Sequence, residues 1–430
     1  MGVKGLTTYI AKHAKNILIP YELHDCNLVI DGDNLIHQLF RDMCRTVNCA
    51  FGGDYDIFYT QVCRFFMLLQ KCKITSFVLL DGGNEKYRLQ TVHTRLKSKI
   101  AAIRHLNPNQ PQQNVVVPIL LREVFVRALQ DMGVHVMRCL FEADEEVANL
   151  AKRLNCPVLS YDSDFYIYNV LYIPFVSLTL KVYRKLVQRN GNQEIQAERC
   201  SMKAKKRNKK ARTPFMSMNM NEPNAVQEED STVECYFYLD CSLYKMENLL
   251  KHTKFDEELL PIFAAIIGND VTERSKLKKF YSGVNIKKTK KSHSKNQRQL
   301  DGVIRWLQHE TLSSALQKLE IRTEKTYRED IVDHVSLASA SYSTTRSASY
   351  TFFGFENNEI SDNTSESSTE SEIIDLQGDS EGEDKTIIKL LDDESTKKEI
   401  PFWLKEKYMQ AQLPRYCIDL IHLKILNIDT

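Results

Sequence analysis

The chain has 430 residues, of which 43% are hydrophobic, and its 58 Lys and Arg residues nearly balance 56 Asp and Glu residues. This length allows two or three domains with buried cores. Only 15 Gly and 11 Pro exclude a collagen-like or wholly low-complexity chain. No apolar run approaches the roughly 18–20 residues of a membrane span, so we expect no membrane partner.

Residues 1–188 alternate between strand-like and helix-like segments. Short apolar runs predict strands, and apolar residues at helical spacing predict helices. This alternation predicts an α/β fold with a parallel sheet flanked by helices. The predicted strands cover 28–30, 77–80, 134–137 and 157–160, and the predicted helices cover 58–72, 85–104, 117–131 and 142–154.

Polar and basic sequence interrupts this pattern at 189–232. It contains a stretch at 203–212 with seven basic residues and no acid. We interpret the stretch as a solvated loop, with a nuclear localisation signal as the alternative. Globular sequence resumes at 233, with an apolar segment over 259–269 and a helical stretch near 300–319.

A second basic stretch, 274–298, holds ten basic residues and no acid, and it follows the apolar segment. It is therefore a candidate for binding phosphates through residues such as Lys276, Lys278 and Lys279. Residues 356–400 hold 15 acidic and 4 basic residues, which leaves a net charge of +13 on the rest of the chain. Because this Ser-rich composition cannot bury enough apolar surface, we predict disorder over 331–400. One or two short helices are expected in 401–430.

The eleven cysteines form no C-x-x-C pair and no zinc-type spacing. Their odd number and scattered positions indicate free thiols in a reducing compartment. The sequence also lacks the P-loop, the dinucleotide-binding fingerprint, the H-E-x-x-H motif and the nucleophile elbow. The chemistry of the chain must therefore come from other residues.

Acidic residues follow four of the strand-like segments, in VIDGDN, VLLDGG, FEADEE and VLSYDSD, and IIGND adds another. Each alone has a structural explanation, because Asp-Gly is a common turn and acids are favoured at helix N-termini. However, the carboxyl ends of parallel strands meet at one edge of a sheet, so these acids should converge. The candidates are Asp31, Asp33, Asp81, Glu142, Asp144, Asp162, Asp164 and Asp270.

Converging carboxylates require cations or protons. Two like charges 4 Å apart repel by roughly 4 kcal/mol at an effective dielectric near 20. Carboxylate oxygens suit Mg²⁺ or Mn²⁺. Two such ions can activate a water and stabilise the leaving oxygen of a phosphodiester.

The motifs resemble those of the flap-endonuclease and xeroderma-group-G nuclease superfamily. MGVKGL, VIDGDNL, VLLDGG, EADEE, CPVLSYDSDF and IIGND occur in the order typical of that superfamily. FGGDYD and LLPIFAAIIGND resemble the asteroid family within it. The resemblance covers roughly 1–190 and 235–310, and weakly 400–430. It implies a PIN-like nuclease core in two halves, 1–188 and 233–330, the second with a helical extension, and two Mg²⁺ ions.

By this resemblance, two groups of acids would hold the two ions. Where the superfamily has Glu-x-Glu, this chain has Glu142-Ala-Asp144, and because Asp is one methylene shorter, we expect its contact with the ion to be water-mediated. The first group is Asp31, Asp81, Glu142 and Asp144, and the second is Asp162, Asp164 and Asp270.

The resemblance also implies residues that contact the nucleic acid. Relatives hold the phosphate with a Lys and an Arg on the helix after Asp81, where Arg88 and Arg95 share one face beside Lys86. A solvated amphipathic helix explains this face equally well. Gly2 would lie near the scissile phosphate, and His37 takes the place of a base-stacking Tyr.

One feature departs from flap endonucleases, which follow the last acid with a Gly-rich hairpin that binds duplex DNA. This chain has VTERSKLKKFYSG there instead. Flap specificity is therefore not expected, and single strands or DNA ends are at least equally plausible substrates.

Our first hypothesis is a nuclear, metal-dependent, structure-selective DNA endonuclease that acts on single-stranded or overhang ends in DNA repair. An additional cytoplasmic location stays open, as does RNA as the substrate. The alternative is an inactive or weakly active nuclease-fold adaptor in signalling, because the acidic, Ser-rich segment could bind basic or regulatory proteins.

Overall fold

The computed structural model describes most of the nuclease-like region. Residues 189–232 and 356–399, which carry the predicted insertion and most of the predicted disordered segment, lie outside the description. The described residues are 2–45, 47–48, 53–85, 89–107, 109, 116–188, 233–268, 277–283, 295–323, 335, 342, 347–355, 400 and 402–422.

An eight-stranded sheet forms the centre of the molecule, in the order β1-β8-β6-β5-β2-β3-β4, with β7 pairing β8 outside this path. The five strands β2 to β6 are mutually parallel, whereas β8 pairs antiparallel with β1, β6 and β7. The strands are β1 (Leu18–Leu23), β2 (Asn27–Asp31), β3 (Thr75–Leu80), β4 (His135–Arg138), β5 (Val158–Ser160), β6 (Tyr172–Pro174), β7 (Val182–Gln188) and β8 (Val233–Tyr244).

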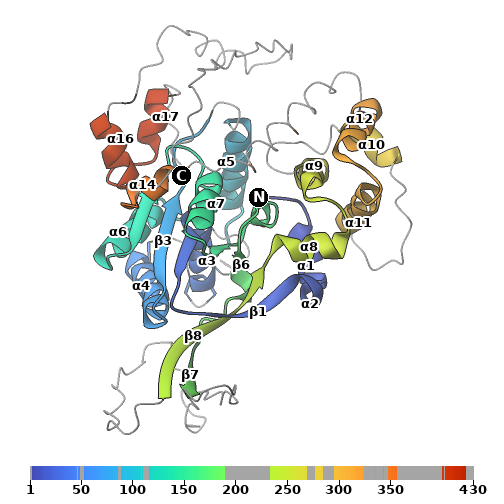
Figure 1. The fold of residues 1–430 in the computed structure, drawn as a ribbon. Coiled ribbons are helices and arrows are strands. Elements are labelled where there is room, and N and C mark those ends of the chain that lie inside the picture. Colours follow the sequence, from blue (N-terminus) through green and yellow to red (C-terminus); the bar gives the residue numbers. More distant parts are fainter. Residues whose placement is uncertain are drawn as a thin grey trace, which may run out of the picture.

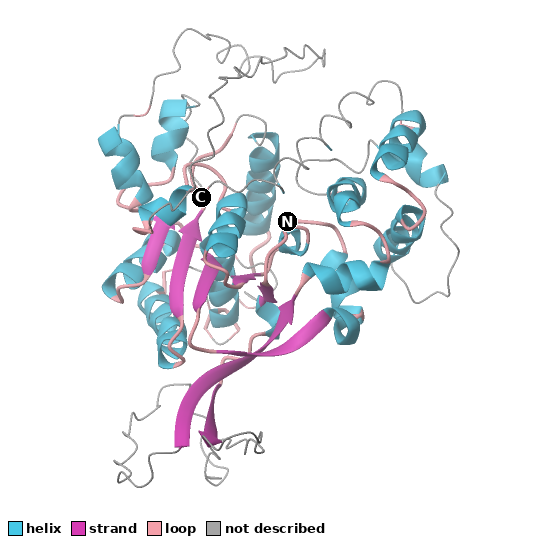
Figure 2. Cartoon of the chain, in the orientation of Figure 1, coloured by secondary structure: helices cyan, strands magenta, loops and turns pink. Residues whose placement is uncertain are grey.

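The predicted α/β fold with flanking helices is thus confirmed, but the sheet is mixed. The long strand β8 adds antiparallel pairing at one side of the parallel strands. Together with β7 it extends beyond the rest of the sheet as a two-stranded arm (Figure 2). Sequence periodicity did not reveal this arm, because strand direction is set by pairing partners far away in the chain.

Helices cover the sheet and extend the molecule at one side (Figure 1). The helices before residue 160 are α1 (Leu6–Lys12), α2 (Ala14–Ile17), α3 (Gly32–Met43), α4 (Tyr55–Lys71), α5 (Leu89–Arg104), α6 (Leu121–Asp131) and α7 (Asp144–Arg153). The later ones are α8 (Met246–Thr253), α9 (Leu260–Ile267), α10 (Lys278–Gly283), α11 (Lys295–Leu307), α12 (Leu312–Arg322), α14 (Ala348–Phe352), α16 (Phe402–Met409) and α17 (Tyr416–His422).

Successive side chains of the central strands point to opposite faces, and each face has its own hydrophobic cluster. In β2, Val29 belongs to one cluster, while Leu28 and Ile30 belong to the other. The first cluster includes side chains of α1, α7, α9 and α11, and the second includes side chains of α3, α4 and α6. The sheet is therefore enclosed between two helical layers, which hold the ends of its strands in place.

Three details differ from the sequence expectation. The helix expected over 117–131 begins at Leu121, so Pro118 lies in the turn before it. The single stretch near 300–319 is two helices, because Thr311 caps a new helix through the Ser314 amide. Inside the segment 331–400, α14 packs against α7, so this part of the segment is ordered.

No helix in the described part of the chain is both long enough and apolar enough to cross a bilayer.

Candidate active site

The parallel strands present their carboxyl ends at one edge of the sheet. Asp31, the last residue of β2, is in register with Leu79 of β3. Ile30 is in register with Leu159 of β5. The turns that follow β2, β3 and β5 therefore lie side by side at the edge of the sheet where the carboxyl ends of the parallel strands meet.

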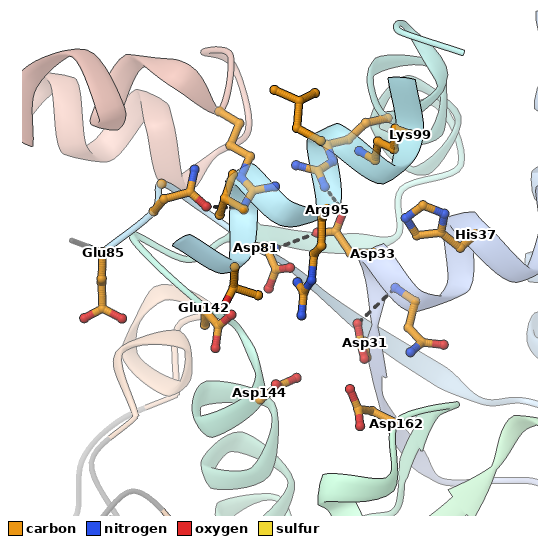
Figure 3. Close-up of a pocket in the computed structure, with 18 residues that line it drawn as sticks. Asp31, Asp33, His37, Asp81, Glu85, Arg95, Lys99, Glu142, Asp144 and Asp162 are labelled. Carbon is orange, nitrogen blue, oxygen red and sulfur yellow. Dashed lines mark hydrogen bonds and ion pairs between the residues drawn. The ribbon is translucent and has the colours of Figure 1, made fainter. Parts of the chain in front are cut away.

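One pocket at this edge collects most of the predicted metal ligands (Figure 3). Asp164 lies beside it, since Asp144, Asp162 and Asp164 each offer an oxygen within 4.8 Å of the others. Asp270 lies outside the described residues. The acids that line the pocket and were predicted as ligands are Asp31, Asp81, Glu142, Asp144 and Asp162.

Asp31 is held from two sides. It is the N-cap of α3, because its Oδ1 accepts a hydrogen bond from the Asn34 amide at 3.1 Å. Its Oδ2 accepts a hydrogen bond from the Ser160 hydroxyl at 2.8 Å. The helix start and the end of β5 thus fix this carboxylate at the pocket.

The turn after β3 needs glycine to place Asp81. The Gly82 amide donates to the Phe141 carbonyl at 2.6 Å, and a Cβ on Gly82 would overlap the carbonyl oxygen of Cys139. This close backbone approach brings Asp81 to the start of α7, where its Oδ1 accepts a hydrogen bond from the Ala143 amide at 3.0 Å. The same approach explains why Glu142 and Asp144 share the pocket with Asp81.

The carboxylates make one another harder to ionise. Burial raises the pKa of Asp144 well above its usual range, and the charges of Asp162 and Asp31 raise it further. Burial and the charge of Asp81 likewise raise the pKa of Asp31 well above normal. The pKa of Asp81 is raised by burial and by Asp33. A divalent cation would relieve this repulsion, since it replaces protons on several carboxylates at once.

Asp33 behaves differently, although it lies only two residues after Asp31. It accepts a hydrogen bond from the Asp81 amide at 2.7 Å and forms an ion pair with Arg122 of α6. Burial opposes its ionisation, but the charges of Arg122 and Arg415 outweigh this effect and lower the pKa of Asp33. Asp33 is therefore an arginine-paired carboxylate that supports the turn after β3, although its charge also raises the pKa of Asp81.

Four basic side chains also line the pocket: Arg95 and Lys99 of α5, Arg122, and Arg415. We predicted a role only for Arg95. Lys99 could have been found from the sequence, because it is four residues after Arg95 on the same helix face. Arg122 and Arg415 come from distant parts of the chain and gave no local signal.

The predicted nucleic-acid-binding residues fall into three groups. His37 lines the pocket and is exposed. Lys278 and Lys279 are exposed on α10 and do not line the pocket, so the structure does not bring them to the acids. Lys86, Arg88 and Lys276 lie outside the described residues.

Gly2 contacts the acidic turn after β5. Its φ is +74°, and a Cβ there would overlap Asp162 Oδ1 and Ser163 Oγ. The Ser163 hydroxyl donates to the Val3 carbonyl at 3.2 Å. The glycine thus allows the N-terminal segment to approach the acids closely.

Several known proteins have sequences similar to this one. The model of the XPG N-terminal domain matches residues 1–102. Protein asteroid of Drosophila melanogaster is 38% identical over 466 aligned positions, which cover 99% of this chain and 54% of that protein. The chain belongs to the asteroid family. The family resemblance seen in the motifs is therefore confirmed.

Other asteroid-related proteins align over less of the chain. Single-strand DNA endonuclease ASTE1 of Danio rerio is 31% identical over 310 residues, covering 71% of this chain and 37% of that protein. The Homo sapiens protein of the same name is 28% identical over 337 residues, which cover 76% of this chain and 43% of that protein. This asteroid-family chain thus spans about half, or less, of the length of these relatives.

Among solved structures, one that aligns with this chain is the catalytic core of Rad2 in complex with DNA substrate. It aligns with a TM-score of 0.41 and 14% identity over 80% of this chain and 89% of that chain. Human GEN1 in complex with Holliday junction DNA aligns with a TM-score of 0.33 and 13% identity, over 80% of this chain and 64% of that chain.

Proposed function

We propose that this asteroid-family chain is a divalent-metal-dependent DNA endonuclease that hydrolyses phosphodiester bonds in single-stranded or overhang DNA. The observation that carries the proposal is the convergence of acids from separate strand ends in one pocket that also contains basic side chains. Relatives named single-strand DNA endonuclease support the class of substrate.

The acids fit Mg²⁺ or Mn²⁺, because they offer hard oxygen ligands and their raised pKa values reflect repulsion that a cation would relieve. When bound, two ions would make water a better nucleophile and stabilise the leaving oxygen. We assign Asp31, Asp81, Glu142 and Asp144 to one ion, and Asp162, Asp164 and Asp270 to the other.

The basic side chains of α5 would hold the phosphate backbone. Arg95 and Lys99 lie in the pocket opposite the acids (Figure 3). The helix α5 is described from end to end and buries none of its side chains, so its basic residues lie at the surface or in the pocket. His37 at the pocket supplies a ring on which an unpaired base can stack.

A nuclear location and a role in DNA repair belong to the same proposal. The basic stretch at 203–212 supports nuclear import, and the acidic segment supports binding to basic regions of repair or signalling proteins.

The decisive experiment compares Asp81→Asn with the wild type on labelled single-stranded and overhang DNA in Mg²⁺. Cleavage should fall by more than about 100-fold, since even changes outside the direct ligands often reduce activity 10–100-fold. The melting temperature should stay within a few degrees, because the Asn side chain still accepts the Ala143 amide. Asp256→Asn, a change at an exposed acid outside the pocket, serves as the control and should cut normally.

Two outcomes would reject the proposal. Cleavage by Asp81→Asn at the wild-type rate would remove the acids from the chemistry. A wild-type protein that neither cuts DNA nor binds Mg²⁺ in calorimetry would favour the adaptor alternative. Matched RNA oligonucleotides in the same assay distinguish DNA from RNA as the substrate.

A further inference from the structure

Residues 402–422, which we call the C-terminal segment, pack against the sheet next to β4. Tyr408 and Ile418 are fully buried. Arg138 of β4 is only 2% exposed; it donates to the Leu413 carbonyl and lies 5.5 Å from the ring centroid of Tyr408. A buried guanidinium is costly without such partners, so this contact is a specific part of the fold.

The C-terminal segment also covers the turn 81–84. The Asn84 amide donates to Asp419 Oδ1 at 2.6 Å, and the Asn84 side-chain amide donates to Asp419 Oδ2 at 3.1 Å. Asn84 is 9% exposed and Asp419 is 1% exposed. A Cβ on Gly83 would lie 2.7 Å from Ile418 Cγ2 and 3.0 Å from Asp419 Oδ1, so the side chains of the C-terminal segment pack directly on the glycine backbone.

Arg415 extends from this segment into the pocket. Its Nε donates to the Gly82 carbonyl, and its Nη2 donates to Asn84 Oδ1 at 3.3 Å. The guanidinium therefore joins two positions of the turn while lining the same pocket as Asp81. Its charge also acts on Asp33 and Asp81.

The turn needs such support. Two consecutive glycines lose more backbone freedom on folding than other residues, so the Asp81–Asn84 backbone is expensive to keep in one conformation. A planar guanidinium with several donors in fixed directions can hold two acceptors at once, which a lysine amine on a flexible chain does less well.

We propose that Arg415 is a positioning residue of the site, which holds the turn 81–84 in the shape that presents Asp81 to a divalent cation. The inference rests on the proposed function, which assigns a divalent cation to these acids, but cation binding and the conformation of the turn can be measured apart from cleavage. On this view the C-terminal segment completes the site, although it lies more than 300 positions after Asp81 in the chain.

The first test uses the full chain without metal. Hydrogen exchange followed by mass spectrometry should show several-fold faster exchange over residues 80–85 in Arg415→Ala and in Asp419→Ala. Lys405→Ala is the matched control, because Lys405 is an exposed cation of the same segment that does not line the pocket. Its exchange should equal that of the wild type. Unchanged exchange in Arg415→Ala would overturn the proposal.

The second test measures cation binding and turnover separately. Calorimetry with Mn²⁺ should show affinity about 10-fold weaker in Arg415→Ala, the scale expected when support of a ligand is lost. Arg415→Lys should recover part of it. In cleavage assays kcat should fall while KM for DNA stays constant. A raised KM with unchanged Mn²⁺ affinity would instead show that Arg415 contacts the phosphate, which contradicts the positioning role.

Two further results keep the proposal falsifiable. If Arg415→Ala melts far below the wild type, Arg415→Met, which keeps the apolar stem but has no hydrogen-bond donor on its side chain, is measured in the same way. Equal Mn²⁺ affinity in that variant would overturn the inference. If the wild type binds Mn²⁺ in an Arg415-dependent manner but cuts no DNA, the proposed function fails while the positioning role stands.

Discussion

Asp31 and Asp144 reach the pocket in different ways. Asp31 accepts two hydrogen bonds, from the Asn34 amide and the Ser160 hydroxyl, which fix its carboxylate before any cation binds. Asp144 opens α7, where the helix dipole favours an acid, but its neighbours are other carboxylates. Without a cation, repulsion at Asp144 should therefore reduce the stability of the fold.

Replacing Asp144 with Asn should separate this repulsion from metal binding. The metal-free variant should melt a few degrees above the metal-free wild type, at about 2–4 °C for each kcal/mol of repulsion removed in a domain of this size. Mg²⁺ should raise the melting temperature of the wild type but not of the variant. Differential scanning fluorimetry with and without Mg²⁺ measures both effects. A lower melting temperature for the metal-free variant would contradict the repulsion.

At the scale of elements, α5 and the turn after β3 have opposite properties. The helix α5, described over its full length, buries no side chain, so its sequence is free to serve binding. The turn after β3 is packed against the backbone of 139–141 and against the C-terminal segment. Substitutions in the helix should therefore change affinity, and substitutions in the turn should change stability.

The double variant Arg95→Ala/Lys99→Ala should bind single-stranded DNA more weakly without a lower melting temperature. Each phosphate contact on a single strand contributes about 0.7 to the slope of log affinity against log salt, so the slope should shrink by about 1.4. Lys97→Ala is the control, because Lys97 is a cation of the same helix that does not line the pocket. Fluorescence anisotropy at several salt concentrations measures the slope. An unchanged slope would show that α5 is only a solvated amphipathic helix.

Gly82→Ala tests the close approach of the turn. Its Cβ would overlap backbone oxygens that cannot move aside easily, so we expect a loss of about 1–3 kcal/mol in the free energy of unfolding. Gly133→Ala is the comparison, because Gly133 has a φ of +65° but open space around it. That change should cost only about 1 kcal/mol from backbone strain. Chemical denaturation measures both, and equal losses would argue against the steric explanation.

At the scale of the whole molecule, the carboxylate pocket links stability to pH. Asp31, Asp81 and Asp144 have raised pKa values in the folded protein. Above the usual pKa near 4, the folded metal-free protein therefore binds more protons at these sites than the unfolded chain does. Their contribution to stability must fall as the pH rises through the folded pKa values.

Metal-free protein should accordingly melt at a higher temperature at pH 5, just above the usual carboxyl pKa, than at pH 8, and saturating Mg²⁺ should remove most of the difference. Thermal denaturation in chelator and in Mg²⁺ at both pH values measures this. Asp144→Asn should show a smaller difference in chelator, which assigns the effect to the pocket rather than to other titrating groups. A metal-free protein that is more stable at pH 8 would contradict the linkage.

The sequence by itself determined the local features of this protein. Apolar periodicity located the helices α4, α5, α6 and α7 and the strands β2, β3, β4 and β5, and acids directly after strands indicated where ligands for a cation would meet. These inferences succeed because periodicity and turn chemistry act within a few residues. The convergence of Asp31, Asp81, Glu142, Asp144 and Asp162 then follows from parallel strands sharing one edge.

Only the tertiary structure decided which side chains balance and support those acids. Asp33 differs from Asp31 because Arg122 packs beside it, and the turn after β3 is held by Arg415 and Asp419 from the far end of the chain. The antiparallel pairing of β8 is likewise set by distant partners. Contacts between residues tens to hundreds of positions apart leave no local pattern, because they depend on how complete elements pack against one another.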